Sequence, residues 1–127
     1  MRLVLTGLIF AGGLMYLMLG VGFLLDPVSS GADFGVSANS EQGLSSMRAD
    51  FTAFFVVATG SMMIGAWRRN GDLLLVAAAL FGIALLGRIV SIVLDGTYEG
   101  AFVPMAAEAV TLVVLLIAHR MLPHRIG

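Results

Sequence analysis

The sequence predicts an all-α fold: an integral membrane four-helix bundle, in one domain that covers residues 1–127. Two observations lead to this prediction. The chain is 59% hydrophobic and only 12% charged, whereas about a quarter of the residues of a soluble domain are charged. The apolar residues also gather in four runs, at 3–25, 51–67, 73–94 and 101–118. Each run approaches the length of about 20 residues that crosses a bilayer.

The first run, 3–25, is uncharged and follows Arg2. A cleavable signal peptide is the alternative, but its apolar core spans about 7–15 residues. No clear cleavage site follows this longer run, so we expect a retained span. Its many glycines should let a neighbouring helix approach closely. The run ends at Asp26-Pro27, because proline disfavours helix at the residue before it.

Residues 26–49 form the one long loop, rich in serine, glycine and alanine. Structureless loops of this length are uncommon and are often lids or disordered segments. Phe34-Gly35-Val36 is apolar and is expected to fold back onto the bundle. A lid over the bundle and a plain surface loop both fit this pattern.

The charged residues are sorted by position. Basic residues border both ends of the chain and the connection between the second and third runs: Arg2, Arg68, Arg69, Arg120 and Arg125. The other two connections carry acidic residues and Arg48 alone: Asp26, Asp33, Glu41, Asp50, Asp95 and Glu99. By the positive-inside rule both termini are cytoplasmic and the long loop faces outward. All seven basic residues are arginine, which hints at a GC-rich bacterial genome and hence at a bacterial inner membrane.

Two charges interrupt the apolar runs. Arg88 precedes the end of the third run by roughly 9 Å and Glu108 follows the start of the fourth by roughly 10 Å, at about 1.5 Å per residue. A short connection makes these helices antiparallel neighbours, so the two charges lie at the same depth. A lone charge in hydrocarbon costs about 2.5–3.5 kcal/mol or more. We therefore predict that Arg88 and Glu108 pair.

More polar residues are expected near this pair. Helical spacing puts Ser91 and Asp95 on the face of Arg88, and Thr111 on the face of Glu108. The complete predicted ligand-binding set is Arg48, Asp50, Arg88, Ser91, Asp95, Glu108 and Thr111. A purely structural ion network that fixes helix register is the alternative, although apolar replacements of such networks are often neutral. For Asp50, a position near a helix N-terminus would be favoured by the helix dipole alone.

The two halves of the chain resemble each other. Leu-Asp ends the first and third runs, and Met-x-Ala followed by an acid opens the second and fourth, with Asp50 and Glu108 as the acids. A parallel repeat of two hairpins would place these carboxylates in equivalent positions.

Several chemistries are not predicted. The chain has no cysteine, which excludes disulfides and thiolate chemistry. His119 and His124 lie five residues apart without a second pair, so no metal, haem or other cofactor is expected. The net charge of −1 offers no basic field for nucleic acid.

Several motifs together resemble a known family. They are the proline-terminated first span, Phe34-Gly35, Arg48-Ala49, Gly87-Arg88 with Ser91 and Asp95-Gly96, and Glu108. The chain is similar to small four-span bacterial membrane proteins that form a domain of unknown function, sometimes labelled "phage infection protein". The family is richer in glycine after Arg-Ala, where this chain has Asp50-Phe51-Thr52-Ala53. The resemblance implies a fold and a topology but no activity.

Three function classes fit the sequence. The first is a membrane protein whose polar pocket, in the outer half of the bundle, binds a lipid or a small amphipathic anion, because arginine offers a planar fork for carboxylate or phosphate. The second is a membrane-embedded acid–base enzyme, of isomerase or cyclase type, acting on an isoprenoid or lipid, with Glu108 or Asp50 moving the proton. The third is a small proton-coupled transporter. Membrane lipids are the expected partners, and the glycine-rich helices could pair in a homo-oligomer.

Overall fold

The computed structural model describes residues 1–123, where the regular secondary structure is helical, without a strand. His124 and Arg125, which entered the expectations above, lie outside the described residues. The helices are α1 (Arg2–Leu25), α2 (Pro27–Asp33), α3 (Glu41–Ser46), the π-helix η1 (Met47–Phe51), α4 (Thr52–Trp67), α5 (Leu74–Asp95) and α6 (Phe102–Met121).

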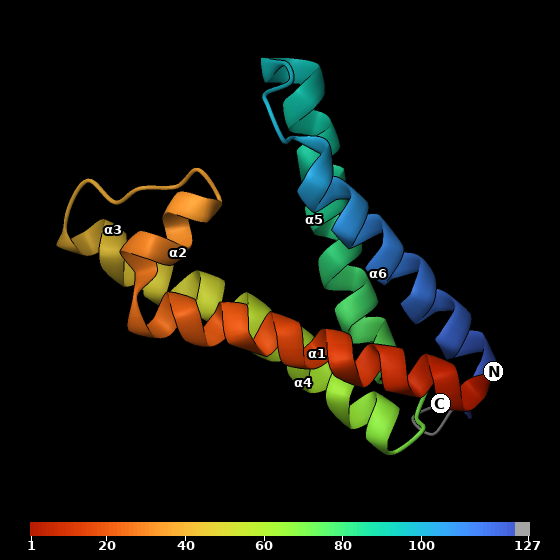
Figure 1. Ribbon diagram of the computed structural model, residues 1–127. Coiled ribbons are helices and arrows are strands. Elements are labelled where there is room, and N and C mark those ends of the chain that lie inside the picture. The colour runs from red at the N-terminus through yellow and green to blue at the C-terminus, as the bar shows by residue number, and fades with distance from the viewer. Residues whose placement is uncertain (124–127) are drawn as a thin grey trace.

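The prediction of four apolar spans is confirmed. Four helical segments are long and apolar enough to cross a membrane: Arg2–Leu25, Glu41–Trp67, Leu74–Asp95 and Phe102–Met121. The protein is therefore an all-α, multi-pass membrane protein. The helices form two hairpins, since α1 packs mainly on α4 and α5 mainly on α6. The hairpins diverge like the arms of a V from the end where both termini lie (Figure 1).

The second span begins earlier than the expected residue 51. Its helical rod runs back through η1 and α3 to Glu41. The side chain of Ser40 accepts a hydrogen bond from the backbone N–H of Gly43 at 3.2 Å, which caps this end of the rod. Glu41 in the first turn adds a favourable charge at the positive end of the helix dipole. The dipole interpretation of Asp50 is therefore wrong, because Asp50 lies within the rod and not at its start.

Residues 26–49 carry two short helices instead of a plain loop. Asp26 caps α2 by accepting from the backbone N–H of Ser29 at 3.2 Å. Phe34 folds back as expected, and its ring lies 5.4 Å from that of Phe23 and 6.0 Å from that of Phe55. The segment is thereby attached to the hairpin of α1 and α4.

Glycines bring α1 and α4 into close contact. A Cβ atom at Gly13 would lie 2.6 Å from Cγ of Met63, and one at Gly20 would lie 3.0 Å from Cβ of Phe55. Across these contacts the Thr59 hydroxyl donates to the Gly13 carbonyl at 3.2 Å. Small residues that permit such approach, together with hydroxyl hydrogen bonds, are the usual means of joining membrane helices.

The apex of the V is fastened by polar contacts. The Ser61 hydroxyl donates to the carbonyl of Leu73 at 2.5 Å and accepts from the N–H of Ala77 at 3.1 Å, so it links α4 to the first turn of α5. On the other side, Nδ1 of His119 lies 3.0 Å from the Gly71 carbonyl. The arms are therefore joined at the apex and separate away from it.

Candidate functional site

A cleft of about 410 Å³ lies between the two hairpins. Its volume falls within the roughly 300–1,000 Å³ of small-molecule sites. Six aromatic side chains line it: Tyr16, Phe34, Phe51, Phe54, Phe55 and Phe81. Three charged side chains line it as well: Asp50, Arg88 and Glu108. The cleft is therefore an aromatic cavity with a few charged groups, which is the usual composition of a ligand site.

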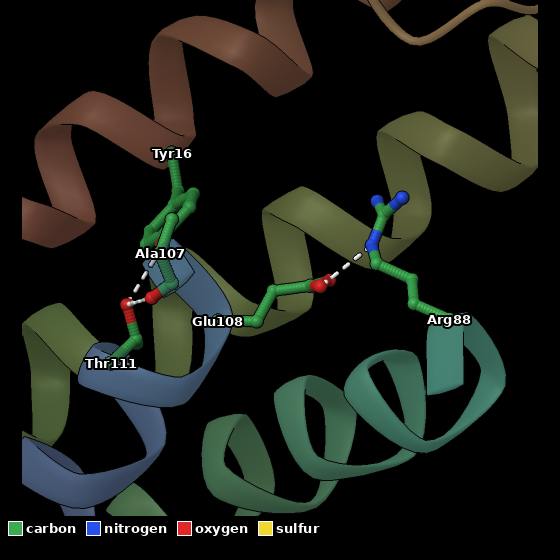
Figure 2. Close-up of polar contacts among 5 residues, drawn as sticks. All are labelled: Tyr16, Arg88, Ala107, Glu108 and Thr111. Atoms are coloured by element: carbon green, nitrogen blue, oxygen red, sulfur yellow. Dashed lines mark hydrogen bonds and ion pairs between the residues drawn. The ribbon is translucent and has the colours of Figure 1, made fainter. Parts of the chain in front are cut away.

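Arg88 on α5 and Glu108 on α6 form the predicted ion pair. Nε of Arg88 donates to Oε1 of Glu108 at 2.6 Å (Figure 2). The Glu108 side chain is 10% exposed and that of Arg88 29%. Short charge-assisted hydrogen bonds of this kind are among the strongest in proteins. The partly exposed arginine thus keeps the almost buried carboxylate from being an isolated charge.

The pair leaves the outer part of the arginine free. Glu108 contacts Nε, and the two Nη atoms make no hydrogen bond to any residue between 1 and 123. Every buried side-chain nitrogen or oxygen among residues 1–123 has a hydrogen-bond partner. Because the two Nη atoms have none, they are not buried. Figure 2 shows both Nη atoms pointing away from Glu108. Arg88 therefore offers a fork of two donors beside the cleft.

Tyr16 on α1 is a site residue that the sequence did not suggest. Its hydroxyl lies 2.8 Å from that of Thr111 on α6, and Thr111 donates to the carbonyl of Ala107 at 2.7 Å. A hydroxyl has a single donor hydrogen, so Tyr16 must be the donor to Thr111. The Tyr16 ring packs on Phe81 at 4.7 Å and on Phe55 at 6.2 Å. Tyr16 therefore joins the two hairpins through α1 and α6 and forms a wall of the cleft.

Two predicted site residues of the π-helix, Arg48 and Asp50, lie in different surroundings. Asp50 lines the cleft, and it forms no hydrogen bond or ion pair with any residue from 1 to 123. Nε of Arg48 donates to the carbonyl of Leu24 at 2.8 Å, and Arg48 is exposed and does not line the cleft. The last carbonyls of a helix lack partners within it, and Arg48 satisfies one at the end of α1. The expectation that Arg48 shares a pocket with Arg88 is therefore wrong.

The remaining predicted residues lie around the pair. Ser91 donates to the Asp95 carboxylate at 3.3 Å, and both residues are exposed. Ser91 and Arg88 line a second hollow of about 210 Å³ between α5 and α6. Asp95 lines neither the cleft nor this hollow. Thr111 is connected to the cleft through Tyr16. Of the seven predicted residues, the cleft thus brings together Asp50, Arg88 and Glu108.

This arrangement can hold a polar head beside an apolar body. The Nη donors of Arg88 suit an acceptor group, and the free carboxylate of Asp50 suits a donor or a cation. The aromatic walls suit hydrocarbon. Within residues 1–123 no group of three or more histidine, cysteine, aspartate or glutamate side chains is placed to hold a metal ion.

The comparisons with known proteins give a family but no activity. Neither the curated proteins nor the solved structures include a match to this sequence. A family model described as a domain of unknown function, DUF4345, matches residues 4–119. The bacterial origin and the phage label attached to the resemblance stay predictions. The chain belongs to the DUF4345 family, whose domain has no assigned function.

Proposed function

We propose that this protein is a membrane-embedded binding protein that holds an amphipathic, lipid-like molecule in the cleft between its hairpins. The observation that carries the proposal is the free Nη fork of Arg88 at the side of an aromatic cavity. A structural ion pair needs no accessible donors. Here Glu108 occupies only Nε and thereby orients the guanidinium.

The position of the cleft in the membrane supports the same function. The connection from α4 to α5 and the last turn of α6 lie at the end of the V that holds the termini, whereas α2, α3 and the connection from α5 to α6 lie at the opposite end (Figure 1). The first two segments carry Arg68, Arg69 and Arg120. With the positive end cytoplasmic, in a bacterial inner membrane, the cleft opens in the outer half of the bilayer. A lipid of the outer leaflet could then enter it sideways, between the arms.

A pair of matched tryptophan substitutions tests the proposal. Ala107 lines the cleft, whereas its neighbour Ala106 is exposed and lines none of the cavities described above. We expect native mass spectrometry of the protein in mild detergent to show a bound lipid-sized mass for the wild type and for Ala106→Trp. Ala107→Trp should lose this mass, because the indole fills the cavity.

Arg88 provides the second test. The Arg88→Leu/Glu108→Leu variant removes both charges, so it leaves no unpaired charge that would prevent folding. It should keep its fold by circular dichroism and lose the bound mass. A wild type that binds no lipid, or variants that all retain the same mass, would show that the cleft is not a binding site.

An acid–base enzyme is the second candidate, favoured by one observation. Glu108 and Asp50 line the same cavity from different hairpins, which is where an enzyme needs its proton donor and acceptor. In that case Glu108→Gln should abolish turnover of a bound isoprenoid or lipid and leave its retention intact. Retention lost together with turnover would favour the binding protein.

A further inference from the structure

The charges that line the cleft do not match a simple anion. The charged side chains are Arg88, Glu108 and Asp50, so the formal net charge of the lining is −1. Glu108 already neutralises Arg88, and Asp50 adds a further negative charge without a partner in the described chain. A negatively charged ligand alone would bring the cleft to −2, and like charges brought together in a cavity are unfavourable.

A simple cation matches the cleft equally poorly. A cation would neutralise Asp50, but it would provide no acceptor for the two Nη atoms of Arg88. Donors that lose water without gaining an acceptor weaken binding. A head that carries both a negative and a positive group satisfies both sites, because each ligand charge then has an opposite partner.

The geometry points to a zwitterionic lipid as the occupant, with its phosphate on the Nη atoms of Arg88 and its ammonium on Asp50. This inference rests on the proposed function and names the class of its ligand. Arginine binds phosphate oxygens through two parallel N–H donors. Carboxylates accept charge-assisted hydrogen bonds from an ammonium. The aromatic walls, including Phe54 and Phe81, would contact the acyl chains.

Asp50 is an exposed carboxylate that lines the cleft. It is not at the start of the helical rod, which begins at Glu41, and it has no partner among residues 1–123. Arg48, two residues away in the same π-helix, turns to the end of α1. π-Helical turns occur frequently at functional sites. In this turn Asp50 lines the cleft, whereas Arg48 contacts the end of α1.

Competition between two lipids tests the inference. The full-length protein in mild detergent receives equal amounts of a phospholipid with an ethanolamine head and one with a glycerol head, both with the same acyl chains. Native mass spectrometry then counts each bound lipid. We expect the wild type to prefer the ethanolamine lipid by about fivefold, the ratio that corresponds to about 1 kcal/mol. Free phosphoethanolamine should not displace it, because it lacks the acyl chains that contact the aromatic walls.

Two conservative variants assign the preference. Asp50→Asn removes the charge with little change in shape and should reduce the ratio of the two lipids to about one. Asp95→Asn is the matched control, since Asp95 is an exposed carboxylate outside the cleft, and it should keep the wild-type ratio. Both variants are expected to fold, because substitutions of exposed residues such as these usually change stability little.

The outcomes separate this inference from the proposed function. Equal retention of both lipids by the wild type, or a preference that Asp50→Asn does not change, would overturn the zwitterionic ligand. In either case a lipid that Ala107→Trp still displaces would leave the binding function standing. A wild type that retains neither lipid would overturn both.

Discussion

The hydroxyl of Tyr16 donates to the hydroxyl of Thr111 at 2.8 Å, across the gap between α1 and α6. These helices belong to different hairpins, so the bond ties the two arms of the V at the inner wall of the cleft. The Thr111 hydroxyl in turn donates a hydrogen bond to the Ala107 carbonyl. The two bonds together form a short chain that ends on α6 beside Glu108 (Figure 2).

Replacing Tyr16 with phenylalanine should loosen this connection. The ring contacts with Phe81 and Phe55 can remain, while the hydrogen bond is lost. Hydrogen bonds between membrane helices contribute about 0.6 kcal/mol on average and up to about 1.7 kcal/mol. We expect the free energy of unfolding, measured by denaturant titration in mixed micelles, to fall by an amount in this range.

Tyr98→Phe is the control for this variant. Tyr98 is 59% exposed, and its hydroxyl forms no hydrogen bond with residues 1–123. It should therefore change the free energy of unfolding by less than about 0.5 kcal/mol. Equal effects of the two substitutions would mean that the Tyr16 bond does not hold the arms together.

The sequence predicted the Arg88–Glu108 pair but not the role of Tyr16. Charges inside apolar runs are conspicuous, and a short connection sets their relative depth. Tyr16 contacts a helix that is far away in the sequence, and no local pattern encodes that contact. A signal was present nevertheless, since Tyr16 is one of two residues with a side-chain hydroxyl in the run 3–25. A buried tyrosine hydroxyl usually has a partner.

The hydropathy pattern did not predict the surroundings of Arg48 and Asp50. The apolar run 51–67 leaves Arg48 in the preceding loop, whereas in the structure both residues lie in the π-helix Met47–Phe51. The start of the second span at Glu41 could have been predicted from the sequence. Ser40 followed by Glu41 is a recognisable helix start, and it lies inside the segment that was expected to be a loop.

Asp26 should titrate at a lower pH than an ordinary aspartate. Hydrogen bonds from the side chain and the backbone of Ser29 lower the pKa of the Asp26 carboxyl below its usual value. Because the pKa is lower in the folded state, the carboxylate stabilises α2 at pH values above the unfolded-state pKa of about 3.9. This contribution is lost as the pH falls through the folded value.

Carbon-detected NMR titration of the Asp26 carboxyl can measure this pKa. Ser29→Ala removes the hydroxyl and keeps the backbone donor, so it should bring the pKa part of the way back to the ordinary value. A pKa of Asp26 that does not respond to Ser29→Ala would contradict the capping arrangement.

Alanine at two glycines of α1 should have opposite effects. A Cβ at Gly13 would come within 2.6 Å of Cγ of Met63, whereas one at Gly7 would meet nothing within 4 Å. Gly13→Ala forces α1 away from α4, and overpacking of this kind costs about 1–3 kcal/mol. Gly7→Ala should be neutral or stabilising by about 0.5–1 kcal/mol, because alanine loses less backbone freedom in a helix. Thermal unfolding of both variants in the same detergent can compare the two signs.

Removing one partner of the Arg88–Glu108 pair should cost more than removing both. Arg88→Leu leaves the nearly buried Glu108 carboxylate without its cation. Breaking a buried pair costs about 3–5 kcal/mol, and the partial exposure of Arg88 reduces this to about 1–3 kcal/mol. Arg88→Leu/Glu108→Leu places two apolar side chains side by side, a change that is often neutral or stabilising.

A double-mutant cycle of Arg88 and Glu108, with the free energy of unfolding measured for all four proteins, gives the coupling energy of the pair directly. We expect the double variant to be more stable than Arg88→Leu and yet unable to retain lipid. If the single and double variants were equally unstable, the two side chains would contribute to stability through packing alone. A double variant that regains stability but does not retain lipid would separate the role of the Nη atoms of Arg88 in binding from the stability of the fold.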